Sequence, residues 1–135
     1  MARLQLQLYV DPGQADVFVS LVRSNQTRTY RTVGTIDTGA EVCLMPLELL
    51  DQIEHRIINN KLEIEQAGIA GQGFSAIEAE VRLSLEDLNG NETRELKVRA
   101  WFAKTDVVLL GFRDLLEHAR LYIDMPHRDG WIEID

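Results

Sequence analysis

The stretch Thr35-Ile36-Asp37-Thr38-Gly39-Ala40 carries one carboxylate into a short turn. The β-branched residues before Asp37 predict the end of a strand. Gly39 permits a backbone turn that a side chain would resist, and the Thr38 hydroxyl can hydrogen-bond locally and stiffen that turn. The sequence therefore predicts that Asp37 sits on a rigid corner between apolar strands. Taken alone, the same residue types are also common in ordinary surface turns.

The composition is that of one globular domain covering residues 1–135. The chain is 45% hydrophobic and 27% charged, which is ordinary for a soluble protein with a real core. Its net charge is −8, and it has no basic patch, so we expect neither nucleic acid nor an anionic membrane surface as a partner. No segment is long and apolar enough to span a membrane, and the N-terminus alternates like a strand rather than a signal peptide. Cys43 is the only cysteine, so we expect a reduced, cytoplasmic protein.

Alternating apolar residues and turn signals predict an all-β chain with two short helices. We expect strands over residues 4–10, 17–22, 27–36, 42–45, 96–100, 107–110, 121–124 and 131–134. The helices are expected at 47–53 and 112–120. Residues 61–87 predict a long hairpin with a glycine-rich tip. This hairpin is either a plain flexible loop or a lid over a bound substrate.

Three of these segments together resemble the retropepsin-like aspartic proteases. The Asp37-Thr38-Gly39-Ala40 turn is similar to the active-site turn of that family, and residues 61–87 are similar to its flap hairpin. Val108-Leu109-Leu110-Gly111 is similar to its hydrophobic segment that ends in glycine. The three occur in family order with family spacing. The resemblance implies a closed acid-protease barrel with a flap hairpin and one or two short helices.

The resemblance also implies an activity, that of an aspartic endopeptidase which needs no metal and no cofactor. It assigns catalysis to Asp37 and support of the active-site turn to three residues: Thr38, Gly39 and Ala40. It places substrate-contacting flap residues at Gly68, Ile69, Ala70 and Gly71. It makes Leu109, Leu110 and Gly111 the second segment of the site.

The chemistry of this family needs two carboxylates, and the sequence supplies one suitable turn. Asp11-Pro12-Gly13 and Asp129-Gly130 lack the hydroxyl residue and the apolar approach. The second carboxylate would then be Asp37 of another copy, across a two-fold axis, with Thr38 of each copy holding the two turns together. Two facing carboxylates share a proton, so one activates a water while the other protonates the scissile carbonyl. The expected partners are therefore a second copy of the chain and a peptide or protein substrate.

Several residues depart from the family pattern. Glu41 stands where an aspartate or a small polar residue is more usual, and Cys43 stands where a hydroxyl residue is common. Arg113 lies one residue later than the arginine of the viral members. These departures leave the Asp37 turn intact, but those at Glu41 and Cys43 slightly favour an alternative, a catalytically silent binding or dimerisation module with the same fold. A third interpretation is a monomeric relative whose turns never meet.

The remaining reactive side chains do not predict another chemistry. His55, His118 and His127 are far apart in the sequence and lack ligand spacing, so we expect no metal site. A lone cysteine in an apolar run, such as Cys43, is more often a small buried hydrophobe than a nucleophile.

If the glycine-rich hairpin is a lid, Gly71→Val should slow turnover without changing the fold. The substitution adds a β-branched side chain where we expect positive φ, and this restricts opening and closing. Peptide turnover should fall while the circular dichroism spectrum stays the same. Unchanged kinetics would show that the hairpin is not a lid.

Overall fold

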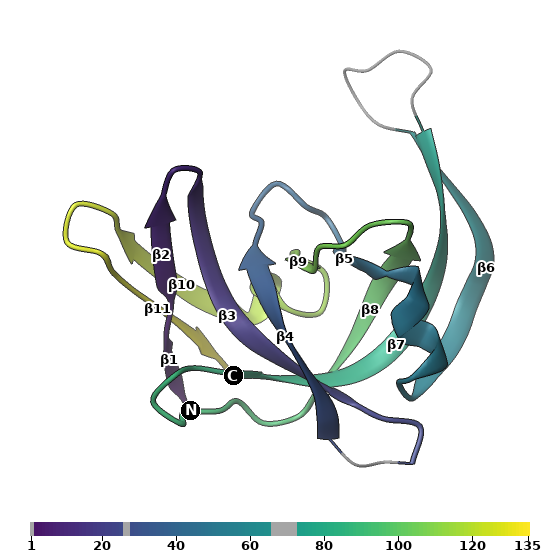
Figure 1. Ribbon diagram of the computed structural model, residues 1–135, viewed down its shortest axis with the longest axis horizontal. Coiled ribbons are helices and arrows are strands. Elements are labelled where there is room, and N and C mark those ends of the chain that lie inside the picture. The colour runs from purple at the N-terminus through teal and green to yellow at the C-terminus, as the bar shows by residue number, and fades with distance from the viewer. Residues whose placement is uncertain (1, 26–27, 66–72) are drawn as a thin grey trace.

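The computed structural model describes residues 2–25, 28–65 and 73–135, most of which lie in strands (Figure 1). The strands are β1 (Arg3–Gln5), β2 (Gln7–Val10), β3 (Gly13–Val22), β4 (Arg28–Ile36), β5 (Cys43–Pro46), β6 (His55–Glu65), β7 (Gly73–Glu86), β8 (Leu96–Ala103), β9 (Leu109–Leu110), β10 (Ala119–Asp124) and β11 (Asp129–Ile134). Two short 3-10 helices, η1 (Leu47–Asp51) and η2 (Leu116–His118), complete the described elements. Neither described helix has the length and apolar character needed to cross a membrane.

Eight strands form one curved sheet in the order β2-β3-β4-β9-β5-β8-β7-β6. Residues 18–21 of β3 also pair with residues 83–86 of β7, so six strands make a ring of hydrogen-bonded neighbours. The ring has its fewest pairings at β9, where one register pair, Leu44 with Leu109, joins this strand to β5. The all-β class is confirmed, whereas the expected barrel is closed at this point by one register pair and not by a continuous ladder.

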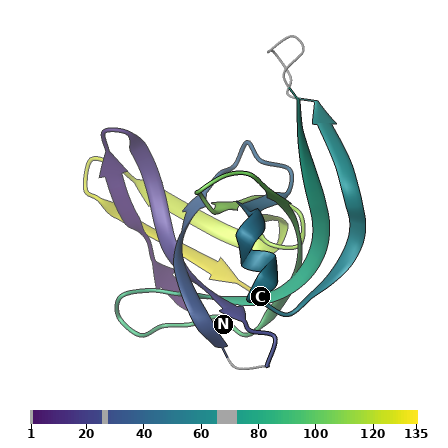
Figure 2. The same cartoon turned by 45° about the vertical axis from the view of Figure 1, so that its right-hand side comes forward.

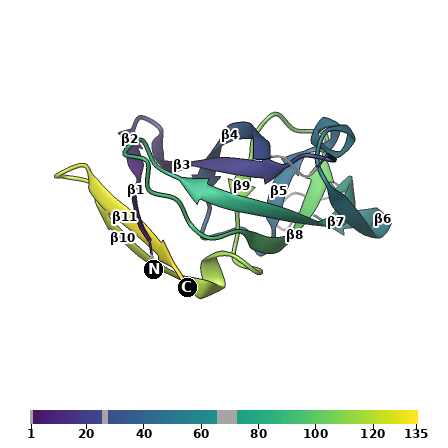
Figure 3. The same ribbon diagram turned by 90° about the horizontal axis from the view of Figure 1, so that it is seen from below.

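The other three strands form a small sheet, in the order β1-β11-β10, at one end of the molecule (Figure 3). We expected residues 4–10 to be one strand, but β1 pairs with β11 while β2 pairs with β3. The change of sheet occurs at Leu6, whose N–H donates to the carbonyl oxygen of Gly130. Leu4 and Leu6 are both buried, so the chain moves between sheets while its apolar face stays in the core.

The alternation predicted for β7 is confirmed and supplies much of the core. Four of its buried apolar residues alternate along the strand: Ala79, Val81, Leu83 and Leu85. They pack in one cluster with side chains of β3, β5 and β8, among them Leu21, Met45 and Phe102. Complete burial of one such large apolar side chain contributes about 1.5–3 kcal/mol. Of the polar residues between them, Glu80 and Arg82 are partly exposed and form ion pairs, whereas Ser84 is buried.

The predicted long hairpin is confirmed in its described part, where β6 and β7 pair antiparallel from His55 and Val81 to Glu65 and Gly73. It begins earlier than expected, because β6 starts at His55 and continues through a register irregularity around Asn59. The hairpin extends beyond the rest of the molecule in both views (Figures 1 and 2). It is therefore a long arm built on the same strand, β7, that carries the core.

The helix predicted over residues 112–120 is wrong, since only η2 forms there. Asp114 has φ 64°, in the left-handed region that interrupts a regular helix. Its carboxylate accepts hydrogen bonds from the N–H and the Nε–H of Arg99, at 3.1 and 3.0 Å. Its own N–H donates to a carboxylate oxygen of Glu117 at 2.7 Å. These contacts hold a turn where the local apolar pattern alone favours a helix.

Asp87 connects the N-terminal strand to the turn after β7. Its carboxylate accepts hydrogen bonds at 2.9 Å from the backbone N–H groups of Gln5, Asn89 and Asn91. The side-chain amide of Asn91 donates a further bond at 2.8 Å. Asp87 is only 4% exposed. Burial alone would raise the pKa of this carboxyl, but the hydrogen bonds together hold its pKa below the ordinary value of 3.8.

Asp87→Ala should therefore destabilise the fold by roughly 2 kcal/mol near pH 7, because three N–H groups lose their acceptor. A lowered folded-state pKa gives stability that is complete above the unfolded pKa and lost as the pH falls through the folded value. The difference in unfolding free energy between parent and variant should shrink in acid. Urea unfolding near pH 7 and near pH 3 measures it.

The exposed Asp51 offers a matched control. Asp51→Ala should change the unfolding free energy by less than about 0.5 kcal/mol at either pH. An Asp87→Ala effect that is equally large at both pH values would contradict the stabilising role of the ionised carboxylate.

Candidate active site

Asp37 lies directly after β4, in the turn that the sequence predicts. The N–H of Asp37 donates to the carbonyl oxygen of Leu110 at 3.0 Å, and the N–H of Ala40 donates to the carbonyl oxygen of Asp37 at 3.1 Å. The N–H of Gly39 donates to Oδ1 of the Asp37 side chain at 2.9 Å. The carboxylate is half-buried, whereas Thr38 and Gly39 are exposed. One acid is thus held at a fixed place on an accessible face.

The predicted second segment lies against this turn. In β9, Leu109 and Leu110 pair in parallel with the last two residues of β4. Beyond them, the N–H of Phe112 donates to the carbonyl oxygen of Ala40 at 3.0 Å. The N–H of Arg113 donates to the carbonyl oxygen of Glu41 at 2.9 Å. The turn therefore donates a hydrogen bond to Leu110, before Gly111, and accepts hydrogen bonds from Phe112 and Arg113, after it.

Gly111 passes so close to the turn that no side chain fits. A Cβ atom there would lie 2.7 Å from the carbonyl carbon and oxygen of Val42 and 2.8 Å from the carbonyl oxygen of Ala40. All three are backbone atoms, which have no rotamer to move away. The close approach of the two chain segments therefore requires glycine at this position.

Cys43 lies behind the same contact and is completely buried. Its Sγ accepts a hydrogen bond from the N–H of Gly111 at 3.3 Å. Burial raises the pKa of the Cys43 thiol to about 11. The thiol is therefore neutral at physiological pH and acts in packing and hydrogen bonding rather than as a nucleophile, as the sequence predicts.

No family model and no curated protein sequence matches this chain. Among solved structures, its fold is similar to the crystal structure of a retropepsin-like aspartic protease from Rickettsia conorii. The match has a TM-score of 0.55 and 18% sequence identity, and it covers 96% of this chain and 88% of that chain. The chain has a retropepsin-like fold.

Within the retropepsin-like fold, the departures at Glu41 and Arg113 form a pair. A terminal nitrogen of Arg113 lies 3.1 Å from Oε1 of Glu41. Glu41 is exposed, so this contact contributes at most about 1 kcal/mol to stability. It joins the Arg113 side chain to the residue that follows Ala40 in the same chain.

A second carboxylate, that of Asp16, lies near the start of the turn and was not predicted from the sequence. Asp16 is 5% exposed, and the Thr35 hydroxyl donates to its Oδ1 at 2.8 Å. The side-chain amide of Gln14 lies 3.0 and 2.9 Å from the two carboxylate oxygens. Asp16 thus fixes Thr35, two residues before Asp37. The available signal was an acidic residue inside the apolar run of β3.

The structure describes some of the remaining predicted site residues and not others. The turn residues and the Leu109–Gly111 segment are brought together as expected. The predicted substrate-contacting residues of the hairpin lie outside the described residues; they are Gly68, Ile69, Ala70 and Gly71. Their role stays a prediction.

Gly111→Ala should destabilise the protein by about 2–3 kcal/mol, because the new methyl group meets backbone atoms. Gly13→Ala is the matched control, since a Cβ there meets its nearest neighbour at 3.9 Å, an ordinary contact. Its effect should stay below about 1 kcal/mol. Thermal and urea unfolding of both variants measure the difference, and similar losses in both would argue against the close contact.

Proposed function

We propose that this chain is an aspartic endopeptidase whose active site forms across a homodimer. The observation that carries the proposal is the Asp37 turn, in which hydrogen bonds from Gly39 and to Leu110 hold one carboxylate on an accessible face. The sequence holds one Asp-Thr-Gly turn, whereas the reaction needs two carboxylates. The shared fold with an aspartic protease supports the same conclusion.

In the proposed dimer, the two Asp37 side chains face each other and share one proton. The ionised carboxylate takes a proton from a bound water as the water oxygen attacks the scissile carbonyl carbon. The protonated carboxyl group gives its proton to the carbonyl oxygen. The carbon–nitrogen bond then breaks as the leaving amine takes up a proton. Every proton moves between the substrate, the water and this pair of acids.

The surface beside the turn suits a second copy of the chain. Phe112 is 42% exposed and Val107 is 45% exposed, and they lie on either side of β9 in sequence. The N–H of Phe112 bonds to the carbonyl oxygen of Ala40, so this aromatic residue is anchored next to the active-site turn. Exposed apolar side chains beside an incomplete site favour burial against a symmetry-related copy. In this proposal Phe112 packs where viral members use an arginine.

The β6–β7 hairpin is proposed as the flap that covers a bound peptide. Its described strands form a long arm that extends from the pair His55 and Val81 to its far end at Glu65 and Gly73. An extended peptide beneath such an arm can form backbone hydrogen bonds and be shielded from water.

The alternative function is a catalytically silent binding or dimerisation module. The departure at Cys43, which favoured this module, has a structural explanation. Cys43 is accounted for by its hydrogen bond with Gly111 and its burial, so this residue does not indicate a lost activity. Glu41 still favours the module slightly, because its ion pair with Arg113 occupies a position next to the turn.

Asp37→Asn separates the two functions. The variant should cleave a peptide library at least about 100-fold more slowly than the parent between pH 4 and 7, because it has lost the general acid and base. Cleavage that survives the substitution would remove Asp37 as the catalyst. A parent that cleaves no peptide would favour the silent module.

The same variant tests the dimer. At pH 7 Asp37→Asn should dimerise at least as tightly as the parent, because it removes the repulsion between facing like charges. In acid the difference should shrink, since protonation removes that repulsion in the parent too. Sedimentation should show a species of about 31 kDa, twice the 15.4 kDa chain. A weaker dimer for the variant at pH 7 would contradict the pairing of the two acids.

A further inference from the structure

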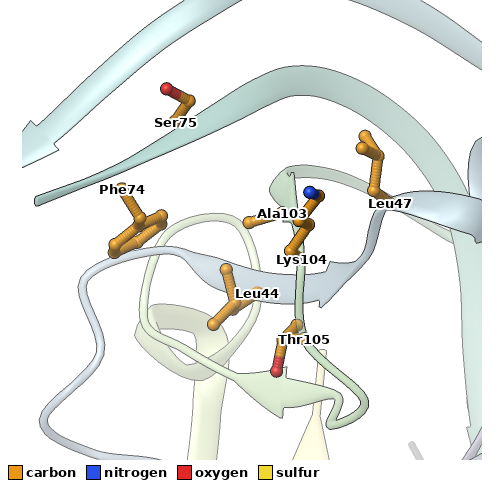
Figure 4. A pocket seen from close by; sticks show the side chains of 7 residues that line it. All are labelled: Leu44, Leu47, Phe74, Ser75, Ala103, Lys104 and Thr105. Atoms are coloured by element: carbon orange, nitrogen blue, oxygen red, sulfur yellow. The ribbon is translucent and has the colours of Figure 1, made fainter.

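A pocket of about 600 Å³ lies between β5, the end of β8 and the start of β7, at the far end of the described β6–β7 hairpin (Figure 4). Its lining is mainly apolar, with three polar side chains among its residues, which are Leu44, Leu47, Phe74, Ser75, Ala103, Lys104 and Thr105. This volume lies in the range of pockets that hold ligands, and it is large enough for a peptide side chain together with adjacent backbone.

The register of the sheet places this pocket close to the Asp37 turn. Leu44 in β5 lies opposite Leu109, which on its other side lies opposite Thr35 in β4. Two strand spacings of about 4.8 Å therefore separate Leu44 from the strand that delivers Asp37. An extended peptide advances about 3.3 Å per residue, so about three residues cover this distance. A peptide with its scissile bond at Asp37 can thus place a nearby side chain in the pocket.

Lys104 is the only charged residue that lines this pocket in the described part of the chain. Figure 4 shows its side chain directed toward the hairpin strand that carries Ser75. No described side chain forms an ion pair with Lys104, although the protein carries a net charge of −8. The nearby carboxylate of Glu63 instead accepts a hydrogen bond from the Ser75 hydroxyl, at 2.9 Å.

We propose that the pocket selects an acidic side chain of the substrate, glutamate before aspartate. The longer methylene stem of glutamate packs against the apolar wall formed by Leu44, Leu47 and Phe74, and its carboxylate pairs with the ammonium group of Lys104. The selected residue lies within about three positions of the cleaved bond, from the strand spacing given above. This inference rests on the proposed function, because it assigns the substrate class of the Asp37 site.

The test compares peptides that differ only by glutamate or glutamine at one position near the cleaved bond. One position should show a preference for glutamate of about 5- to 10-fold in kcat/KM, the size expected for a partly exposed ion pair. Lys104→Met keeps the apolar stem and should abolish the preference, so that the variant cleaves glutamate and glutamine peptides with equal kcat/KM. Lys104→Glu should reverse the preference in favour of lysine peptides.

Lys97→Met is the matched control, because Lys97 is exposed and is not part of this pocket's lining. It should leave the glutamate preference unchanged. Equal cleavage of glutamate and glutamine peptides by the parent would overturn the inference and leave the proposed protease standing. A preference that survives Lys104→Met would overturn it in the same way.

Binding measured without cleavage separates the two proposals. Fluorescence anisotropy of labelled peptide pools, with glutamate or glutamine fixed at one position, is measured on Asp37→Asn with and without Lys104→Met. Selective binding of glutamate that depends on Lys104 supports the pocket even if the parent cleaves nothing, and in that case only the protease proposal fails. Absence of selective binding in the presence of Lys104 overturns the inference about the pocket.

Discussion

The structure depends on the close approach of two backbone segments at Gly111. The absence of a side chain there lets the backbone directly after β9 lie close to the carbonyl groups of Ala40 and Val42. The same approach lets the carbonyl oxygen of Leu110 accept from Asp37 and lets the N–H of Gly111 reach Cys43. This one contact holds the candidate site in place. It also holds β9, where the sheet has its fewest pairings. A change that separates the segments would disturb Asp37 and the pairing of β9 together.

Features with a local cause could be predicted from the sequence. The Asp37 turn, the hairpin of β6 and β7, and the buried face of β7 follow from turn residues and from a period of two. The Leu109–Gly111 segment was identified through its family resemblance, and the structure shows its physical reason at Gly111. In each of these cases, local preference and tertiary packing favour the same conformation.

Features with a distant cause could not be predicted in this way. Asp114 accepts hydrogen bonds from Arg99, and this long-range contact replaces the helix that the apolar spacing indicates. The N-terminal segment changes sheets at Leu6 because its partner is Gly130, at the far end of the chain. Asp16 was overlooked for the same reason, since only the pairing of β3 with β4 brings it to Thr35.

The ladder between β3 and β7 has a consequence for how the chain folds. It joins residues such as Leu21 and Leu83, which are distant in sequence, whereas β3 with β4 and β6 with β7 are hairpins of near neighbours. Hairpins form within microseconds, but contacts between distant segments require closure of a long loop and form more slowly. Until that ladder forms, the edges of β3 and β7 are unpaired and able to join strands of other chains. The step that completes the ring is therefore the one at which folding competes with aggregation.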